Sequence, residues 1–93
     1  MSSIFKNQDY LTIRLDTNVD ISSATSREIL YQKPDGSTGE WDAVLYGTTQ
    51  MEYLVEPGDL DQAGEWQFQS KFVLNGETGY GEKAYKKIDK NLD

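Results

Sequence analysis

The strongest constraint on the fold is the alternation of residue types that follows Gly64. From Trp66 to Leu74, four of five alternate positions hold large apolar side chains, and polar residues fill most positions between them. This period of two residues is typical of a strand with one buried face. Ahead of it, Pro57-Gly58 and Ala63-Gly64 bracket a short acidic segment, where glycine permits a tight corner. The sequence thus predicts a long β-strand that is entered through a turn.

The same alternation recurs in shorter segments along the rest of the chain. The expected strands are residues 10–15, 26–33, 40–46, 51–55, 66–74 and 80–88. Pro34-Asp35-Gly36 and Asn75-Gly76 begin two hairpin signals, the second extending to Gly79, and residues 16–24 form an irregular loop. No segment of ten or more residues follows a helical period, so at most one helical turn is expected, near residues 58–63. Six or seven short antiparallel strands predict an all-β fold, a β-sandwich.

The inward positions of these strands define the expected core. They are Leu11, Ile13, Leu15, Ile29, Tyr31, Trp41, Leu45, Tyr53, Val55, Trp66, Phe68, Phe72 and Leu74. The opposite positions place apolar side chains on outer faces, namely Leu30, Val44, Tyr46, Leu54, Val73 and Tyr85. Scattered singly, such residues have no functional meaning, whereas a contiguous outward patch indicates a protein–protein interface. The alternative is that the ends of the chain cover some of these side chains.

The chain of 93 residues is expected to form one domain with two short extensions. Residues 1–9 are an N-terminal arm, residues 10–88 the β domain, and residues 89–93 a charged C-terminal tail. Ile4 and Phe5 are the only large apolar residues of the arm after Met1. They can anchor the arm on a partner or pack against their own domain.

Composition excludes several classes of function. The chain contains neither cysteine nor histidine, which removes disulfides, thiolate chemistry, the usual general base near neutral pH and the commonest metal ligand. Small extracellular domains are often disulfide-bonded, so the absence of cysteine favours synthesis in a reducing cytoplasm. A net charge of -7 disfavours binding to nucleic acid. No apolar run exceeds four residues, so we expect no membrane insertion.

One acidic loop resembles a metal-binding motif. Asp16, Asn18 and Asp20 have the spacing that opens an EF-hand loop, but Ile21 stands where the motif needs glycine and Arg27 where it needs glutamate. The sequence therefore predicts no EF-hand and no metal site. Another calcium site built from these carboxylates stays open as the alternative to a solvated loop.

Candidate catalytic and sugar-binding residues are few. Asp59 and Asp61 could form an acid/base pair for glycoside hydrolysis, but caps on turn N–H groups explain them better. We therefore expect no catalytic residue, no cofactor and no enzyme activity. Sugar binding would need exposed flat aromatic side chains, for which Tyr46, Tyr80 and Tyr85 are the candidates.

In the order of its short motifs, the chain resembles small bacteriophage proteins and domains with an immunoglobulin-like fold, found among tail, baseplate and head accessory proteins. The resemblance spans roughly Tyr10 to Ile88 and rests on five stretches. They are Leu11-Thr12-Ile13-Arg14-Leu15, Asp20-Ile21-Ser22-Ser23-Ala24-Thr25 with Tyr31-Gln32-Lys33-Pro34-Asp35-Gly36, Gly39-Glu40-Trp41, Gly58-Asp59-Leu60-Asp61-Gln62-Ala63-Gly64-Glu65-Trp66, and Gly81-Glu82. The chain differs from immunoglobulin domains proper in lacking both sheet-bridging cysteines. It also has Gly64-x-Trp66 where a tyrosine corner is expected.

The resemblance implies a fold and a role. The fold is an immunoglobulin-like β-sandwich of six or seven antiparallel strands. The role is a non-enzymatic structural component of a bacteriophage virion, at the tail, the baseplate or the capsid surface, synthesised in the cytoplasm of the bacterial host. The implied partners are other virion proteins and further copies of the chain itself. The alternative is a host-surface glycan- or receptor-binding β-sandwich module.

Overall fold

The computed structural model describes residues 4–5, 12–56 and 58–89, and within them the chain forms strands and turns without a helix. Residues 58–63, where at most one helical turn was expected, form turns and bends without a helical turn. The strands are β1 (Ile4–Phe5), β2 (Thr12–Asp16), β3 (Ser26–Gln32), β4 (Thr38–Asp42), β5 (Val44–Tyr46), β6 (Gln50–Leu54), β7 (Gly64–Leu74) and β8 (Glu77–Asp89). The prediction of an all-β fold, made from the alternation of residue types, is thus confirmed.

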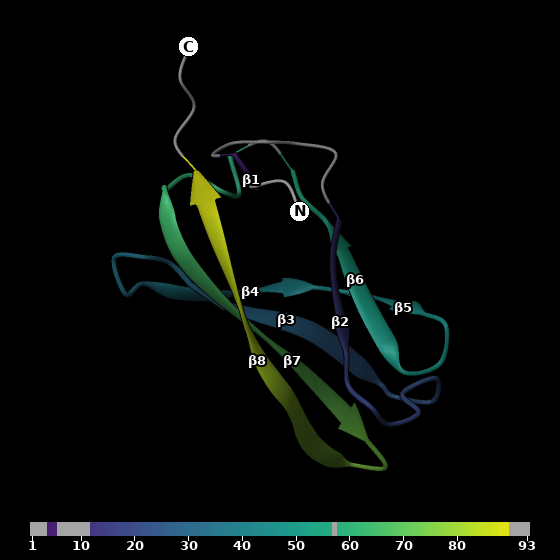
Figure 1. Ribbon diagram of the computed structural model, residues 1–93. Coiled ribbons are helices and arrows are strands. Elements are labelled where there is room, and N and C mark those ends of the chain that lie inside the picture. The colour runs from purple at the N-terminus through teal and green to yellow at the C-terminus, as the bar shows by residue number, and fades with distance from the viewer. Residues whose placement is uncertain (1–3, 6–11, 57, 90–93) are drawn as a thin grey trace.

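The strands form two sheets that lie against each other (Figure 1). The large sheet has the order β1-β8-β7-β3-β4, and the small sheet has the order β2-β6-β5. Neighbouring strands are antiparallel except β1, which runs parallel to the end of β8 and pairs Ile4 with Ile88. The described part of the arm therefore lies against its own domain, and β8 extends one residue into the predicted tail.

The predicted strand over residues 40–46 is wrong in one respect, because it divides between the two sheets. β4 pairs with β3 in the large sheet, whereas β5 pairs with β6 in the small sheet. The chain crosses at Ala43, whose N–H donates to the carbonyl oxygen of Arg27 at 2.9 Å. Trp41, Ala43 and Leu45 all pack against the core on either side of this crossing. The alternation continues through Ala43, so the sequence pattern gives no sign that the pairing partner changes.

The core fills the space between the sheets and contains most of the expected residues. Ile13, Leu15, Ile29, Val55, Trp66, Phe68 and Phe72 are buried, and Tyr31, Trp41, Leu45, Tyr53 and Leu74 are partly buried against them. Leu11 lies outside the described residues. Ile21, Ala24, Met51, Leu60 and Ile88 are also buried, although they were absent from the predicted core. Ile21 and Leu60 belong to connections that pass from one sheet to the other, which takes their side chains between the layers.

Five aromatic side chains form the centre of this core. The rings of Trp41 and Tyr53 are stacked with centroids 4.6 Å apart, which joins β4 of the large sheet to β6 of the small sheet. Tyr31 lies 4.6 Å from Trp41 and 5.8 Å from Trp66 by ring centroids, and Phe68 lies within 6.1 Å of both tryptophans. Trp66 is fully buried and donates its Nε1–H to the carbonyl oxygen of Gln62 at 3.0 Å. Its hydrogen bond thereby fixes the corner that precedes β7.

Two local features set the course of β8. Asn75 and Gly76 both have positive φ, 54° and 78°, and connect β7 to β8 in a two-residue turn, tighter than the predicted turn over residues 75–79. Further along, Gln69 pairs with Lys83 but Lys71 pairs with Tyr80, so β8 has one extra residue at this point, a β-bulge. Because of the bulge, Tyr80 and Lys83 lie on the same face although they are three residues apart.

Replacing the central tryptophan tests the assigned core. Trp66→Ala removes a fully buried side chain and is expected to lower the free energy of unfolding by about 3–5 kcal/mol, the usual range for such truncations. Chemical denaturation monitored by circular dichroism measures the loss. Tyr80→Ala is the matched control, because Tyr80 is 57% exposed and its removal is expected to change stability by less than about 0.5 kcal/mol. Equal stabilities of the two variants would contradict the inward position of Trp66.

Candidate functional site

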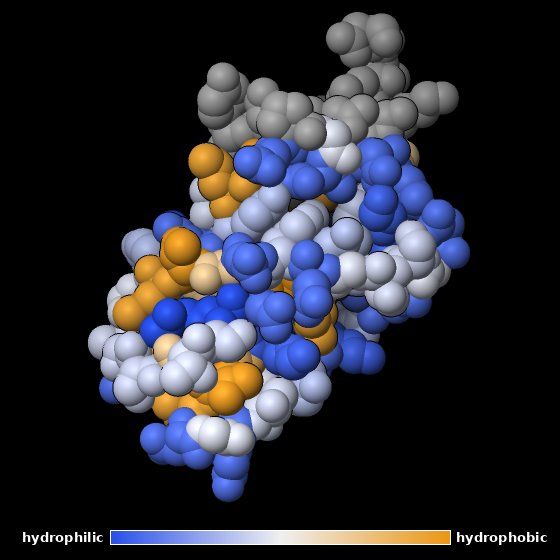
Figure 2. Space-filling model, turned by 180° about the vertical axis from the view of Figure 1, so that it is seen from behind, coloured by the Kyte–Doolittle hydropathy of each residue, from blue (hydrophilic) through white to orange (hydrophobic). Residues whose placement is uncertain are grey.

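Exposed apolar side chains gather on the outer faces of both sheets. Viewed from behind, the surface is mainly hydrophilic with separate hydrophobic patches (Figure 2). Among the residues whose burial the structure describes, the exposed large hydrophobic ones are Val19, Val44, Tyr46, Leu54, Tyr80 and Tyr85. By register, Val44, Tyr46 and Leu54 lie on the outer face of the small sheet, whereas Tyr80 and Tyr85 lie on the outer face of the large sheet.

The outer face of the small sheet is organised around Arg14. Its Nε and Nη2 both donate to Glu52 Oε2, at 3.0 and 2.7 Å, and its guanidinium carbon lies 3.7 Å from the centroid of the Tyr46 ring. The hydrogen bond to Glu52 raises the pKa of Arg14. Val44 stands beside Glu52 in register, and Leu54 stands two residues further along β6. Because Arg14 and Glu52 neutralise each other, this face presents Val44, Tyr46 and Leu54 around an internally paired centre.

The predicted interface residues do not form one contiguous patch, because they divide between opposite sides of the molecule. Val44, Tyr46 and Leu54 lie on the small sheet, whereas Leu30, Val73 and Tyr85 lie on the large sheet. Leu30 and Val73 are moreover only partly exposed. Ile4 and Phe5 form β1, but their side chains lie outside the described part of the structure. The alternation of residue types predicts which residues face outward on a strand. It does not predict to which of the two sheets that strand belongs.

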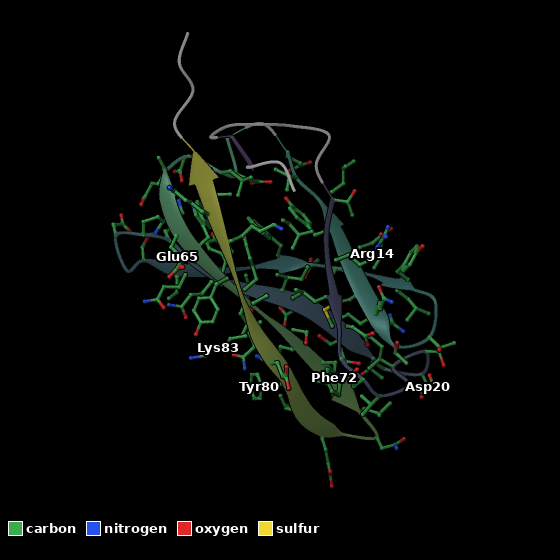
Figure 3. All side chains as sticks on the ribbon, in the orientation of Figure 1. Arg14, Asp20, Glu65, Phe72, Tyr80 and Lys83 are labelled. Atoms are coloured by element: carbon green, nitrogen blue, oxygen red, sulfur yellow. The ribbon has the colours of Figure 1, made fainter. Side chains whose placement is uncertain are left out.

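The outer face of the large sheet contains a groove of about 440 Å³. Two rows of side chains cross strands β4, β3, β7 and β8 in register and form its walls. One row is Glu40, Leu30, Gln69 and Lys83, and the other is Thr38, Gln32 and Gln67, continued by Tyr85. Lys83 and Glu65 lie on this side of the molecule, and Arg14 lies on the opposite side (Figure 3).

The tyrosines that are candidates for sugar binding therefore lie on opposite faces of the domain. Tyr80 and Tyr85 share the grooved face and are 57% and 55% exposed, whereas Tyr46 is on the small sheet under Arg14. Sequence reasoning missed the three glutamines, Gln32, Gln67 and Gln69, as candidate functional residues. Their outward parity on strands β3 and β7 was the available signal, but only the register of these strands brings them together.

A cluster of carboxylates lies beside the groove. Glu28 is next to Glu40 and Asp42 on the outer face, and its Oε1 lies 4.0 Å from Lys71 Nζ. Partial burial, followed by repulsion from Glu40, raises the pKa of Glu28. Folding thus makes the charged form of Glu28 less favourable, relative to the protonated form, than it is in water.

The other acidic residues singled out by sequence have structural partners. Asp59 Oδ2 accepts hydrogen bonds from Tyr53 Oη and Glu56 N, each at 2.7 Å. Burial, followed by the hydrogen bond to Asp59, raises the pKa of Tyr53. Asp59 therefore caps a turn N–H group as expected. Asp61 instead forms an ion pair with Lys33, whose Nζ lies 3.0 Å from both of its carboxylate oxygens, so a turn cap is the wrong description of Asp61.

The acidic loop of residues 16–20 consists of two separate turns. Asp16 Oδ1 accepts from Asn18 N at 2.8 Å, and Asp20 Oδ1 accepts from Ser22 N at 2.9 Å and from Ser22 Oγ at 2.6 Å. The two bonds from Ser22 lower the pKa of Asp20. Across residues 4–5, 12–56 and 58–89, no group of three acidic, histidine or cysteine side chains is placed to hold a metal ion.

Comparison with protein-family models, curated proteins and solved structures finds no significant match to this chain. Among the described residues, no helix is long and apolar enough to cross a membrane. The functional assignment therefore depends on the two outer faces themselves.

Calcium is expected to have no effect on stability. A ligand stabilises a protein only when it binds the folded state in preference to the unfolded state, and the carboxylates of Asp16 and Asp20 each cap a different turn. Melting temperatures in millimolar calcium and in EDTA should therefore agree. A calcium-dependent rise of several degrees that disappears in Asp20→Asn would establish a site in this loop.

Glu28→Gln is expected to raise the melting temperature at pH 7. A carboxyl group whose pKa is raised by folding binds its proton more tightly in the folded state, so stability falls as pH rises through that pKa. The gain should vanish below about pH 4, where the glutamate is protonated in both states. Thermal melts from pH 3 to 8 measure the difference. Glu82→Gln makes the same change of charge at an exposed position and serves as the control.

Proposed function

We propose that the chain is an immunoglobulin-like domain that serves as a non-enzymatic structural component of a bacteriophage particle. The strand order supports the fold. In immunoglobulin notation, β2-β6-β5 corresponds to strands B-E-D, and β8-β7-β3-β4 corresponds to G-F-C-C′. The connections β2–β3, β4–β5 and β6–β7 each pass between the sheets, and β5–β6 and β7–β8 stay within one, as in that topology.

The observation that supports assembly is a group of exposed apolar side chains on the outer face of the small sheet. Val44 and Leu54 are 61% and 60% exposed, Tyr46 is 43% exposed, and they surround an ion pair that needs no external partner. Exposed apolar side chains grouped in this way favour association with another protein. β2 and β5 also have a strand neighbour on one side only within the described residues, so each leaves a backbone edge for a partner strand.

The proposed partner is another protein of the same particle, at the tail, the baseplate or the capsid surface. The net charge of -7 disfavours a nucleic-acid role within the particle. Val44 and Leu54 are 61% and 60% exposed, so burying the rest of each side chain would contribute roughly 1–2 kcal/mol. The two side chains would therefore supply a large part of the binding free energy of a weak interface.

Charging this face tests the proposal. A phage that lacks the gene is complemented with Val44→Asp/Leu54→Asp, and the copy number of the chain in purified particles is measured by quantitative mass spectrometry. We expect at least a ten-fold loss of incorporation, because the two aspartates would have to be desolvated at the interface.

Tyr80→Asp/Tyr85→Asp is the matched control, since it makes the same kind of change at two exposed positions of the opposite face. This variant should be incorporated at the wild-type level, and both variants should melt cooperatively in isolation. Absence of the wild-type chain from particles would contradict the structural role. Full incorporation of the charged small-sheet variant would contradict the proposed interface but not the structural role.

A further inference from the structure

The groove on the large sheet is independent of the proposed assembly face, because the two lie on opposite outer faces of the domain. We propose that this groove binds a neutral oligosaccharide, of which it contacts two or three sugar units.

The walls combine polar groups with the apolar side chain of Leu30, and the polar groups match a ligand with many hydroxyl groups. Each hydroxyl both donates and accepts hydrogen bonds, and the side-chain amides of Gln32, Gln67 and Gln69 offer both functions, as does the hydroxyl of Thr38. Gln69 is already oriented, because its Nε2 donates to the carbonyl oxygen of Gly81 at 2.9 Å. This bond directs the amide so that its oxygen remains to accept from a ligand.

The charge of the groove favours a neutral ligand. Glu40 and Lys83 lie at opposite ends of one wall, so their charges compensate. Phosphate groups would meet a single lysine among the wall residues, and in the next row the carboxylates of Glu28 and Asp42 outnumber Lys71. Strand addition by a peptide requires a free backbone edge. β3 and β7 are paired on both sides at the floor of the groove, and the outer edge of β4 lies at one end of the groove and not along it. Nucleic acids and extended peptides therefore fit less well.

The dimensions and the aromatic groups suit a short sugar chain. The groove crosses four strands, about 14 Å, which is the length of a short oligosaccharide. Tyr85 extends one wall at the β8 end and is 55% exposed, and Tyr80 is exposed on the same strand. A tyrosine ring with one accessible face can stack on the apolar face of a sugar ring while its hydroxyl stays in water. Tyr85 is accordingly the expected stacking residue.

Titration of the full chain with maltotriose, cellotriose and tri-N-acetylchitotriose tests the proposal. Proton–nitrogen NMR should show saturable shifts of the side-chain amide signals of Gln32, Gln67 and Gln69 with at least one trisaccharide. The amide signal of Gln50, on the small sheet, should stay unchanged. A blocked alanine tripeptide at the same concentration should produce no shift.

Two tyrosine variants test the stacking residue, one as the test and the other as its matched control. Tyr85→Ala should weaken the affinity at least ten-fold, equivalent to about 1.4 kcal/mol, whereas Tyr46→Ala on the opposite face should leave it unchanged. Both side chains are exposed, and dispersed NMR spectra verify that each variant is folded. Absence of a saturable response to all three trisaccharides would overturn the proposal. So would shifts confined to Gln50, equal losses in both variants, or a response to the tripeptide alone.

Discussion

The packing of a few aromatic rings between the large and the small sheet is the interaction on which the rest of the structure depends. The stack of Trp41 on Tyr53 connects the sheets directly, and the buried Trp66 joins the same cluster to the corner before β7. A domain of 93 residues buries a modest share of its surface, so a few large side chains supply much of its stability. Each sheet is held in place by its inner face, which leaves the outer faces available for function.

Polar contacts at one end of the domain have a structural purpose. Lys33 pairs with Asp61, and Asp35 accepts a hydrogen bond from Gln62 Nε2 at 2.8 Å, so the β3–β4 turn is fastened to the corner between β6 and β7. Hydrogen bonds from Ser37, with the bond from Gln62, lower the pKa of Asp35 to about 2. Acidic residues that resemble a catalytic pair in the sequence are thus used to hold connections together.

The two outer faces differ in chemistry although both are formed by the same alternation. On the small sheet, the charges of Arg14 and Glu52 are satisfied internally and the apolar side chains remain. On the large sheet, amides, a lysine and a carboxylate line a groove beside exposed tyrosines. A protein of this kind can be held in an assembly by one face while the other stays accessible to a small ligand. The two proposals therefore require different surfaces and can fail separately.

The sequence by itself determined the strand-forming segments and the inward side of each, because a period of two residues is a local property of the extended chain. It therefore identified Trp66, Phe68 and Ile29 as core residues. Only the tertiary structure decided that the segment over residues 40–46 divides between sheets, that Ile21 and Leu60 are buried in crossing connections, and that a bulge places Tyr80 on the same face as Lys83. The predicted interface residues were divided between two faces for the same reason. Which strands become neighbours depends on long-range pairing, and alternation contains no information about it.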